Sequence, residues 1–162
     1  MRAREATLGD AEAIASIYSS GIAERTATFQ TEARTECDVA LWFATELPKI
    51  VVEQDGRVIA YAAAFPYSDR CCYGGIAEFS VYVDPLSRGQ GAGKLALAEL
   101  IEASRAAGLH KLTSRIIAEN KVSLSLMASV GFREIGIFEK HGKLDGVWRD
   151  VIAVERLIPE NL

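Results

Sequence analysis

Residues 78–94 read EFSVYVDPLSRGQGAGK, and this stretch decides the fold. Its first six residues largely alternate between polar and apolar side chains, which is typical of a half-buried strand. Three glycines follow at every second position, Gly89, Gly91 and Gly93, and then a segment with the apolar spacing of a helix. The stretch therefore predicts a strand, a glycine-rich turn and a helix in immediate succession.

The turn has the properties of an anion-binding site. Glycines let the backbone approach a ligand closely, and the first turn of a helix offers free N–H groups and the positive end of its dipole. Arg88 and Lys94 add full positive charge on either side. We therefore expect the following residues to hold a phosphate group: Arg88, Gly89, Gln90, Gly91, Ala92, Gly93 and Lys94.

Three kinds of phosphate-binding loop compete for this pattern. A Walker loop requires serine or threonine after its lysine, but Lys94 is followed by Leu95. A dinucleotide fingerprint requires a different glycine spacing in an early βαβ unit. Residues 88–93 instead match [Arg/Gln]-x-x-Gly-x-[Gly/Ala], the pyrophosphate loop of coenzyme A acetyltransferases. The sequence thus resembles the GNAT superfamily of N-acetyltransferases, which implies acetyl-CoA as the co-substrate.

A second motif extends this resemblance over nearly the whole chain. Residues 120–123 (NKVS) precede an expected helix, and residues 130–132 (VGF) follow it. In the family, an asparagine and a nearby small residue at this helix start contact coenzyme A, which implies such contacts for Asn120 and Ser123. The alternative is that Asn120 merely caps the helix.

Three segments resemble the phosphinothricin-type branch, which acetylates phosphinothricin, methionine sulfoximine and related amino acids. Residues 28–32 resemble its Phe-x-Thr-Glu loop, residues 77–83 its Glu-x-Ser-Val-Tyr-Val strand, and residues 142–150 its late Lys-x-x-x-x-Trp-x-Asp hairpin. The resemblance implies acetylation of a small amino-acid-like amine by a homodimer, with a role in antibiotic or herbicide resistance. Phe29 is then a wall of the substrate site, with burial in the core as the alternative.

The strand at residues 76–83 carries the expected catalytic group. With a period of two, Glu78, Ser80 and Tyr82 share one face of this strand. An acceptor amine arrives as an ammonium ion and must lose a proton before it attacks a thioester. We expect Glu78 to take that proton, directly or through one water, because the resemblance puts the branch's catalytic glutamate there. The alternative is an exposed Glu78 that pairs with an arginine.

The same strand is expected to hold the donor for direct transfer in a ternary complex. Backbone amides of Val81 and Val83 would bind the pantetheine arm and polarise the thioester carbonyl. Many GNAT enzymes place a tyrosine seven residues after the motif asparagine as general acid, but this chain has Met127 there. Either Tyr82 or solvent protonates the leaving thiolate, or no acid is needed.

The loop at residues 66–75 is expected to meet the acceptor. Arg70 and Tyr73 match a basic and an aromatic position of the branch, and Ser80 lies on the adjoining strand face. Ser68 stands where relatives often carry a further basic side chain, which weakens the case for phosphinothricin itself. Two alternatives stay open: an acetyltransferase for a peptide amino terminus or a polyamine, and a non-catalytic acyl-CoA-binding module.

Length and composition favour one domain over residues 1–162, with 49% apolar residues and a net charge of −4. The mildly acidic balance argues against a nucleic-acid-binding protein. Neither a signal segment nor a membrane-spanning run is apparent, so we expect a cytoplasmic protein with no membrane partner. The cysteines, including adjacent Cys71 and Cys72, make no zinc or disulfide pattern and no metal is expected; a covalent route through them is disfavoured. His110 and His141 are expected to be structural.

The order of the expected elements indicates an α/β protein of the α+β type. Strands are expected at 2–6, 50–53, 57–65, 76–83, 111–117, 132–140 and 147–157, and helices at 10–23, 36–47, 92–107 and 120–130. This order predicts the GNAT fold, a mixed and mostly antiparallel sheet of about six to seven strands flanked by about four helices.

Overall fold

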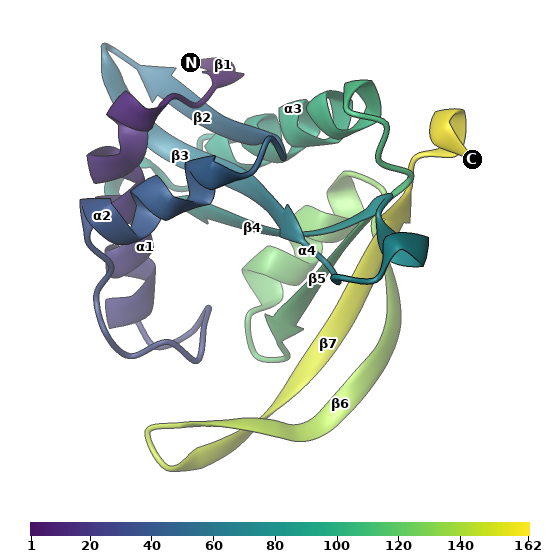
Figure 1. The fold of residues 1–162 in the computed structure, drawn as a ribbon. Helices are drawn as coiled ribbons and strands as arrows, with labels where there is room; N and C mark the ends of the chain where they lie inside the picture. Colours follow the sequence, from purple (N-terminus) through teal and green to yellow (C-terminus); the bar gives the residue numbers. More distant parts are fainter.

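One seven-stranded sheet forms the centre of the computed structural model, which describes all of residues 1–162 (Figure 1). The strand order is β1-β2-β3-β4-β5-β7-β6, and only the β4–β5 pair is parallel. The strands are β1 (Arg2–Glu5), β2 (Lys49–Gln54), β3 (Arg57–Pro66), β4 (Ile76–Val83), β5 (Lys111–Ile117), β6 (Arg133–Leu144) and β7 (Val147–Leu157). The predicted mixed, mostly antiparallel sheet is therefore confirmed.

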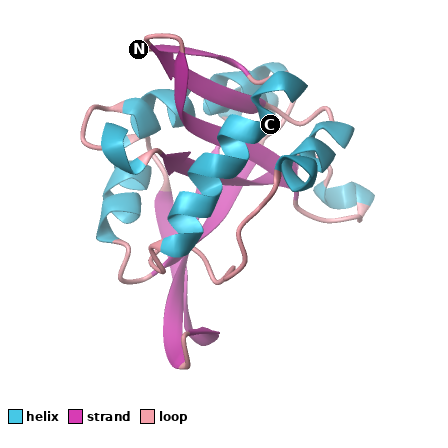
Figure 2. Ribbon diagram, turned by 90° about the vertical axis from the view of Figure 1, so that its left-hand side faces the viewer, coloured by secondary structure: helices cyan, strands magenta, loops and turns pink.

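Four α-helices cover the two faces of this sheet (Figure 2). They are α1 (Ala11–Ala23), α2 (Glu36–Ala40), α3 (Ala92–Ala106) and α4 (Lys121–Ser129). Helices α1 and α2 enclose a core cluster with Tyr61 on one face. Helices α3 and α4 enclose a larger cluster on the other face. Both faces of the sheet are thus buried by helices that come from different halves of the chain.

The helix predicted over residues 36–47 is wrong in its second half. Helix α2 gives way to a 3-10 helix at Leu41–Ala44. In this arrangement the ring of Trp42 packs against those of Tyr18 and Phe65, with centroids 6.0 and 4.9 Å away. We attribute the change of winding to the burial of these rings, because aromatic packing outweighs the small difference between the two helix types.

Two capping boxes of the same kind begin the first two helical segments. The amides of Thr7 and Thr35 donate to the carboxylates of Asp10 and Asp38, each at 2.8 Å. In the first box Asp10 is buried and Thr7 is exposed, and the guanidinium of Arg4 donates two hydrogen bonds of 2.8 Å to Asp10. The hydrogen bonds of the second box are exposed. The helix predicted over residues 10–23 is confirmed as α1, which follows a 3-10 turn at Leu8–Asp10.

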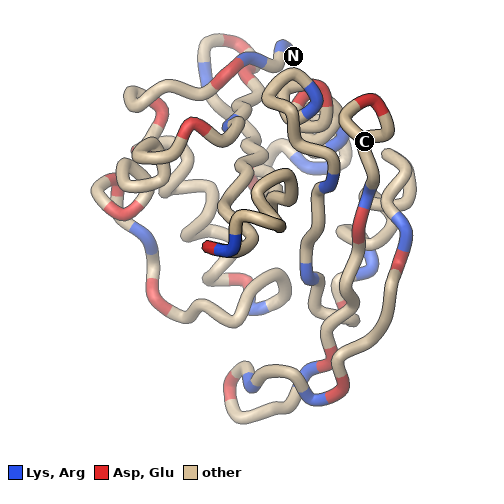
Figure 3. Tube along the Cα trace, turned by 45° about the vertical axis from the view of Figure 1, so that its right-hand side comes forward, with Lys and Arg blue, Asp and Glu red and all other residues tan.

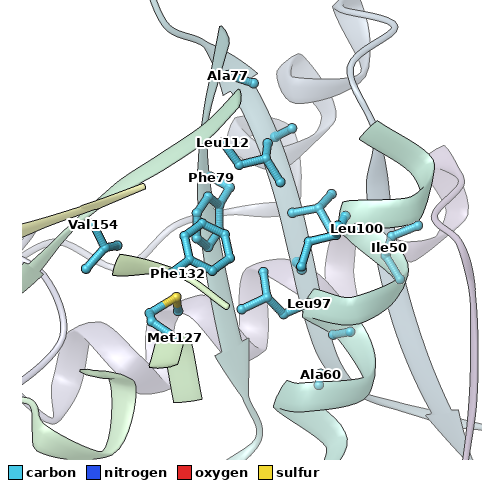
Figure 4. Close-up of a cluster of buried hydrophobic side chains, with 14 of the residues drawn as sticks. Ile50, Ala60, Ala77, Phe79, Leu97, Leu100, Leu112, Met127, Phe132 and Val154 are labelled. Carbon is cyan, nitrogen blue, oxygen red and sulfur yellow. The ribbon is translucent and has the colours of Figure 1, made fainter. Parts of the chain in front are cut away.

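The larger core cluster packs against the apolar face of β4 (Figure 4). Phe79 of β4 packs against Phe132 with ring centroids 5.0 Å apart. Leu97 and Leu100 of α3 are fully buried in the same cluster. Each fully buried side chain of this size stabilises the fold by about 1.5–3 kcal/mol. The apolar face of β4 is therefore held firmly, which orients the polar side chains on its other face.

Strands β4 and β5 pair only at their beginnings. The paired residues are Ile76 to Glu78 of β4 and Lys111 to Thr113 of β5. Both strands continue beyond these pairs, β4 along β3 and β5 along β7. The two strands therefore diverge after Glu78, and a gap opens in the middle of the sheet.

Strands β6 and β7 form a hairpin that extends well beyond the rest of the sheet (Figure 1). β6 is an edge strand of 12 residues, and its register shifts between Phe138 and Gly142. Within that irregular segment, the amide of Lys140 donates to the carboxylate of Asp150 at 2.8 Å. Basic and acidic residues are interspersed along the whole chain, the hairpin included (Figure 3).

Candidate functional site

A cavity of about 950 Å³ opens where β4 and β5 diverge. Its wall contains most of the site residues predicted from the sequence: Phe29, Ser80, Val81, Tyr82, Val83, Arg88, Gly89, Gly91, Ala92, Gly93, Lys94, Asn120 and Ser123. Four predicted residues, Arg70, Tyr73, Glu78 and Gln90, are not part of this wall. The fold thus brings segments from residue 29 to residue 123 around one space.

The edge of β4 that faces β5 carries free backbone groups. The Ser114 hydroxyl donates to the carbonyl of Phe79 at 3.0 Å, so the backbone of Phe79 faces β5. Successive residues of a strand direct their backbone groups to opposite edges. Val81 and Val83 therefore present their N–H and C=O groups to the gap, since no strand pairs with this edge beyond Glu78.

The glycine turn offers a row of amides without protein partners. None of the backbone N–H groups of residues 88–94 donates to another group of the protein, and the first helical bond runs from Leu95 to Gly91 at 3.0 Å. Gly91 has a φ of 87°, and a Cβ there would meet nothing within 4 Å. At Gly93, by contrast, a Cβ would come within 3.1 Å of Val83. The turn therefore packs closely against β4 and points free donors outward, as an anion site requires.

Helix α4 contributes its start to the cavity. The side-chain oxygen of Asn120 accepts from the amide of Ser123 at 3.1 Å, so Asn120 does cap the helix. Asn120 and Ser123 also line the cavity, and the cap leaves the Asn120 amide nitrogen without a partner in the protein. Met127 lines the cavity two turns further on and is buried. At this position the cavity wall therefore has no tyrosine hydroxyl that could act as a general acid.

The two basic residues that flank the turn differ in their surroundings. The guanidinium of Arg88 donates two hydrogen bonds, of 2.9 and 2.7 Å, to the carboxylate of Glu24 at the end of α1. Lys94 makes no ion pair, although both residues line the cavity. Positive charge at the turn is thus free at Lys94 and engaged at Arg88.

The opposite end of the cavity is built by the loop after α1 and by the β6–β7 hairpin. Phe29 lines this end and packs so closely on Gly142 that a Cβ there would come within 2.8 Å of its ring. Phe29 is therefore a wall of the cavity. His141 also lines the cavity and stacks on Phe138, with centroids 4.5 Å apart. From the sequence we expect a structural role for His141, and the structure in addition places it in the cavity wall.

Glu78 lies beside the cavity, at the point where the strands begin to diverge. Its carboxylate is 3.6 Å from the guanidinium of Arg115 on β5, and its side chain is 41% exposed. The pairing with an arginine agrees with the alternative interpretation of Glu78, whereas its place next to the cavity agrees with the catalytic one. The sequence reasoning missed Arg115, although its position on alternate residues of β5 puts it on the face of Glu78.

Tyr82 is buried among other aromatic rings. It stacks on Tyr61 with centroids 5.7 Å apart and lies 5.0 Å from Tyr18. Burial, together with the nearby Tyr18, holds the pKa of the Tyr82 hydroxyl well above its ordinary value. A phenol with a raised pKa gives up its proton reluctantly, which disfavours it as an acid for a thiolate.

Arg70 and Tyr73 lie on the outer surface next to a short 3-10 helix at Cys71–Tyr73. The ring of Tyr73 contacts Tyr67, with centroids 5.8 Å apart, rather than the cavity. In this structure the cavity therefore takes its basic side chain near Glu78 from Arg115 and not from Arg70.

Comparison with known proteins agrees with this geometry. Residues 14–132 match the model of the Acetyltransferase (GNAT) family. The chain belongs to this family. As a GNAT enzyme it is an N-acetyltransferase, and its acetyl donor is acetyl-CoA.

Three individual proteins are similar to this chain over most of its length. An L-methionine sulfoximine/L-methionine sulfone acetyltransferase of Pseudomonas aeruginosa is 32% identical over 160 residues, covering 94% of this chain and 91% of the relative. The structure of a phosphinothricin acetyltransferase from Sinorhizobium meliloti in complex with acetyl-CoA has a TM-score of 0.90 and 30% identity, covering 96% and 87% of the two chains. A ribosomal-protein-alanine N-acetyltransferase from Brucella melitensis has a TM-score of 0.92 and 30% identity, covering 98% and 100%.

The residues present fit acetyl-CoA. The free amides of residues 88–94 suit its pyrophosphate, and the free edge of β4 suits the amides of its pantetheine arm. Acetyl-CoA supplies the acetyl group as a thioester.

Other kinds of site are not found. No helix of the protein is long and apolar enough to cross a membrane. No group of three His, Cys, Asp or Glu side chains is arranged to hold a metal ion. The three cysteines are exposed and none lines the cavity. The cavity between β4 and β5 is therefore the candidate active site.

Proposed function

We propose that this GNAT enzyme acetylates the amine of a small amino-acid-like acceptor of the phosphinothricin or methionine sulfoximine type. The observation that carries the proposal is the position of Glu78. Its carboxylate lies where the gap between β4 and β5 begins, and the free amides of residues 88–94 lie at the other end of that gap. Val83 is five positions after Glu78, which is about 17 Å along the strand. Such a span suits an extended arm between a pyrophosphate and a reacting acyl group.

Glu78 acts as the general base in this proposal. The acceptor ammonium gives a proton to the Glu78 carboxylate through one water, since the carboxylate lies beside the cavity wall. The free amine then forms the new N–C bond to the acyl carbon while the C–S bond breaks, and the nitrogen releases its second proton to solvent as the amide forms. The backbone amide of Val81 donates to the acyl oxygen as negative charge develops on it.

The leaving thiolate takes its proton from solvent. Met127 offers no proton, and the raised pKa of Tyr82 disfavours it as a donor. Direct transfer in a ternary complex is supported because no cysteine lines the cavity to carry the acetyl group covalently. Tyr82 then serves as a rigid wall between α1 and the gap.

The experiment is a thiol-release assay with acetyl-CoA and a panel of amines, run on the wild type and on Glu78→Gln. The panel holds phosphinothricin, methionine sulfoximine, methionine sulfone, a polyamine and a short peptide that begins with alanine. We expect turnover of the amino acids, and a loss of about 10²- to 10⁴-fold in kcat/KM at neutral pH in the variant. Activity should recover partly at high pH, where the amine loses its proton unaided.

The control is Glu102→Gln, which removes an exposed carboxylate on α3 that pairs only with Arg105. It should leave kcat/KM within twofold of the wild type. Both variants should bind acetyl-CoA with unchanged affinity, measured by calorimetry. An active Glu78→Gln would exclude Glu78 as the base. Tight donor binding without turnover of any acceptor would favour the non-catalytic binding module instead.

Acetylation of a peptide amino terminus is the second candidate. The similarity to the alanine N-acetyltransferase from Brucella melitensis favours it. The peptide in the panel separates the two, because only this candidate predicts that the peptide is the better substrate by kcat/KM.

We also propose that the chain acts as a homodimer that buries the outer side of the β6–β7 hairpin. Large apolar side chains on this hairpin are exposed: Ile135, Ile137, Phe138, Val147 and Trp148. A long edge strand with exposed apolar side chains is normally covered by a partner, because it otherwise invites aggregation. The hairpin also builds one end of the cavity, so a partner there would help to shape the acceptor site.

A further inference from the structure

Arg115 has all of its hydrogen-bond donors free. Its guanidinium carries five N–H groups, and none of them donates to any group of the protein. The other arginine in the cavity wall, Arg88, is engaged by Glu24 through two hydrogen bonds. Arg115 is therefore the arginine of the cavity whose donors are free to form a bidentate pair of hydrogen bonds with a ligand carboxylate.

Arg115 contacts its surroundings without using its donors. The guanidinium carbon lies 6.0 Å from the centre of the Phe138 ring, and that ring is itself stacked on His141. Glu78 is 3.6 Å away, which makes an ion pair but not a hydrogen bond. Glu78 and Arg115 thus form an ion pair without a hydrogen bond, and with 41% and 56% of their side chains exposed both keep acceptors and donors open to a ligand.

The position of the pair separates it from the donor site. Glu78 and Arg115 stand where β4 and β5 begin to diverge, whereas Lys94 and Lys121 stand at the starts of α3 and α4. Lys94 belongs to the turn with the free amides, and Lys121 lines the same cavity. Arg115 lies instead next to Glu78, where the acceptor must present its amine, and its donors are unused although its charge is paired with that of Glu78.

We propose that Arg115 binds the α-carboxylate of the acceptor while Glu78 receives its ammonium group. An α-amino acid carries both charges on the same carbon atom, and the Glu78–Arg115 pair offers the opposite charge to each of them. This inference rests on the proposed function and makes it more specific, because the acceptor must be a free α-amino acid. A polyamine would place a second cation near Arg115, and a peptide would leave Arg115 without a negative partner.

The experiment compares two acceptors that differ only in the carboxylate: methionine sulfone and its carboxamide. Each is assayed with the wild type, Arg115→Gln and Arg115→Lys. In Arg115→Gln we expect kcat/KM for methionine sulfone to fall by about 10- to 100-fold, mainly through KM, because a charged hydrogen-bonded partner is lost. The carboxamide should change by less than twofold, and Arg115→Lys should restore part of the loss.

A binding measurement makes the test independent of turnover. Calorimetric titration of methionine sulfone into the enzyme saturated with coenzyme A, which cannot transfer an acetyl group, should show the same loss in Arg115→Gln. The control is Arg105→Gln on α3, which removes an exposed guanidinium that pairs with Glu102. It should leave both acceptors unaffected.

Several results would overturn the inference. An equal loss with both acceptors would mean that Arg115 only maintains the local structure, and no loss with either would mean that it does not touch the acceptor. Selective loss of methionine sulfone in Arg70→Gln, with Arg115→Gln unchanged, would assign the carboxylate to Arg70. If the wild type binds methionine sulfone but never acetylates it, the proposed function fails and the titration alone decides the role of Arg115.

Discussion

At the scale of single residues, Gly93 packs closely on its neighbours. A Cβ at this position would lie 3.1 Å from a methyl group of Val83 and 3.3 Å from one of Leu126, so these side chains or the start of α3 would have to shift by a few tenths of an ångström. We expect Gly93→Ala to raise the dissociation constant of acetyl-CoA about tenfold, or about 1.4 kcal/mol, as free amides of the turn shift. Isothermal titration calorimetry measures this directly.

Gly136→Ala is the matched control for that substitution. Gly136 lies in β6, and a Cβ there would meet nothing within 4 Å. Its affinity for acetyl-CoA should equal that of the wild type. Equal affinities in all three proteins would mean that close packing of the turn on β4 is not needed for donor binding.

At the scale of elements, the two capping boxes allow a test of what burial adds to the same motif. Asp10 is buried and hydrogen-bonded to Arg4, which lowers the pKa of its carboxyl below the ordinary value, whereas Asp38 is only half-buried and accepts its hydrogen bonds from Thr35. We expect Asp10→Asn to lower the free energy of unfolding by about 1–2 kcal/mol at neutral pH, and Asp38→Asn by less. Urea unfolding followed by circular dichroism gives both values.

The pH dependence of the Asp10 effect has a definite sign. Because the pKa of Asp10 is lower in the folded than in the unfolded chain, its stabilisation is complete above the unfolded value. It is lost as the pH falls below about 4, the ordinary range of an aspartate. The difference between the wild type and Asp10→Asn should therefore shrink between pH 5 and pH 2. A constant difference over this range would contradict the role of the ionised carboxylate.

The sequence predicts elements well where local signals agree with the tertiary structure. Asp55 and Gly56 both have positive φ in the turn between the strands predicted at 50–53 and 57–65, and β4 begins and ends where alternation in residues 76–83 places it. Prediction fails at Trp42, because only the folded chain brings Phe65 next to it. Helical spacing alone carries no information about that contact.

The site is predictable in part for the same reason. The glycine turn and the start of α4 are local motifs, and the structure places both in the cavity wall. Arg115 and His141 lie on β5 and β6, and only the folded chain brings these strands to the cavity, so no motif in the sequence marks the two residues. Arg70 shows the opposite error, since a match in sequence did not bring its side chain to the cavity.

At the scale of the whole molecule, the exposed apolar side chains of the β6–β7 hairpin predict a dimer. An aspartate at Ile137, which is 63% exposed on β6, should bring an unpaired charge into the interface and produce a monomer at micromolar concentration. Size-exclusion chromatography with light scattering gives the mass in each case. Leu41→Asp alters a leucine that is 74% exposed in the 3-10 helix at Leu41–Ala44, outside the hairpin, and should remain a dimer. A monomeric wild type would refute the proposed interface.

The short pairing between β4 and β5 divides the sheet into two leaves, β1–β4 and β5–β7, joined along three residue pairs. We infer that a ligand arm bound along the free edge of β4 would take the place of an eighth strand beside β4. Binding of acetyl-CoA would then lengthen the ladder of hydrogen bonds on β4, and release of the product would shorten it again.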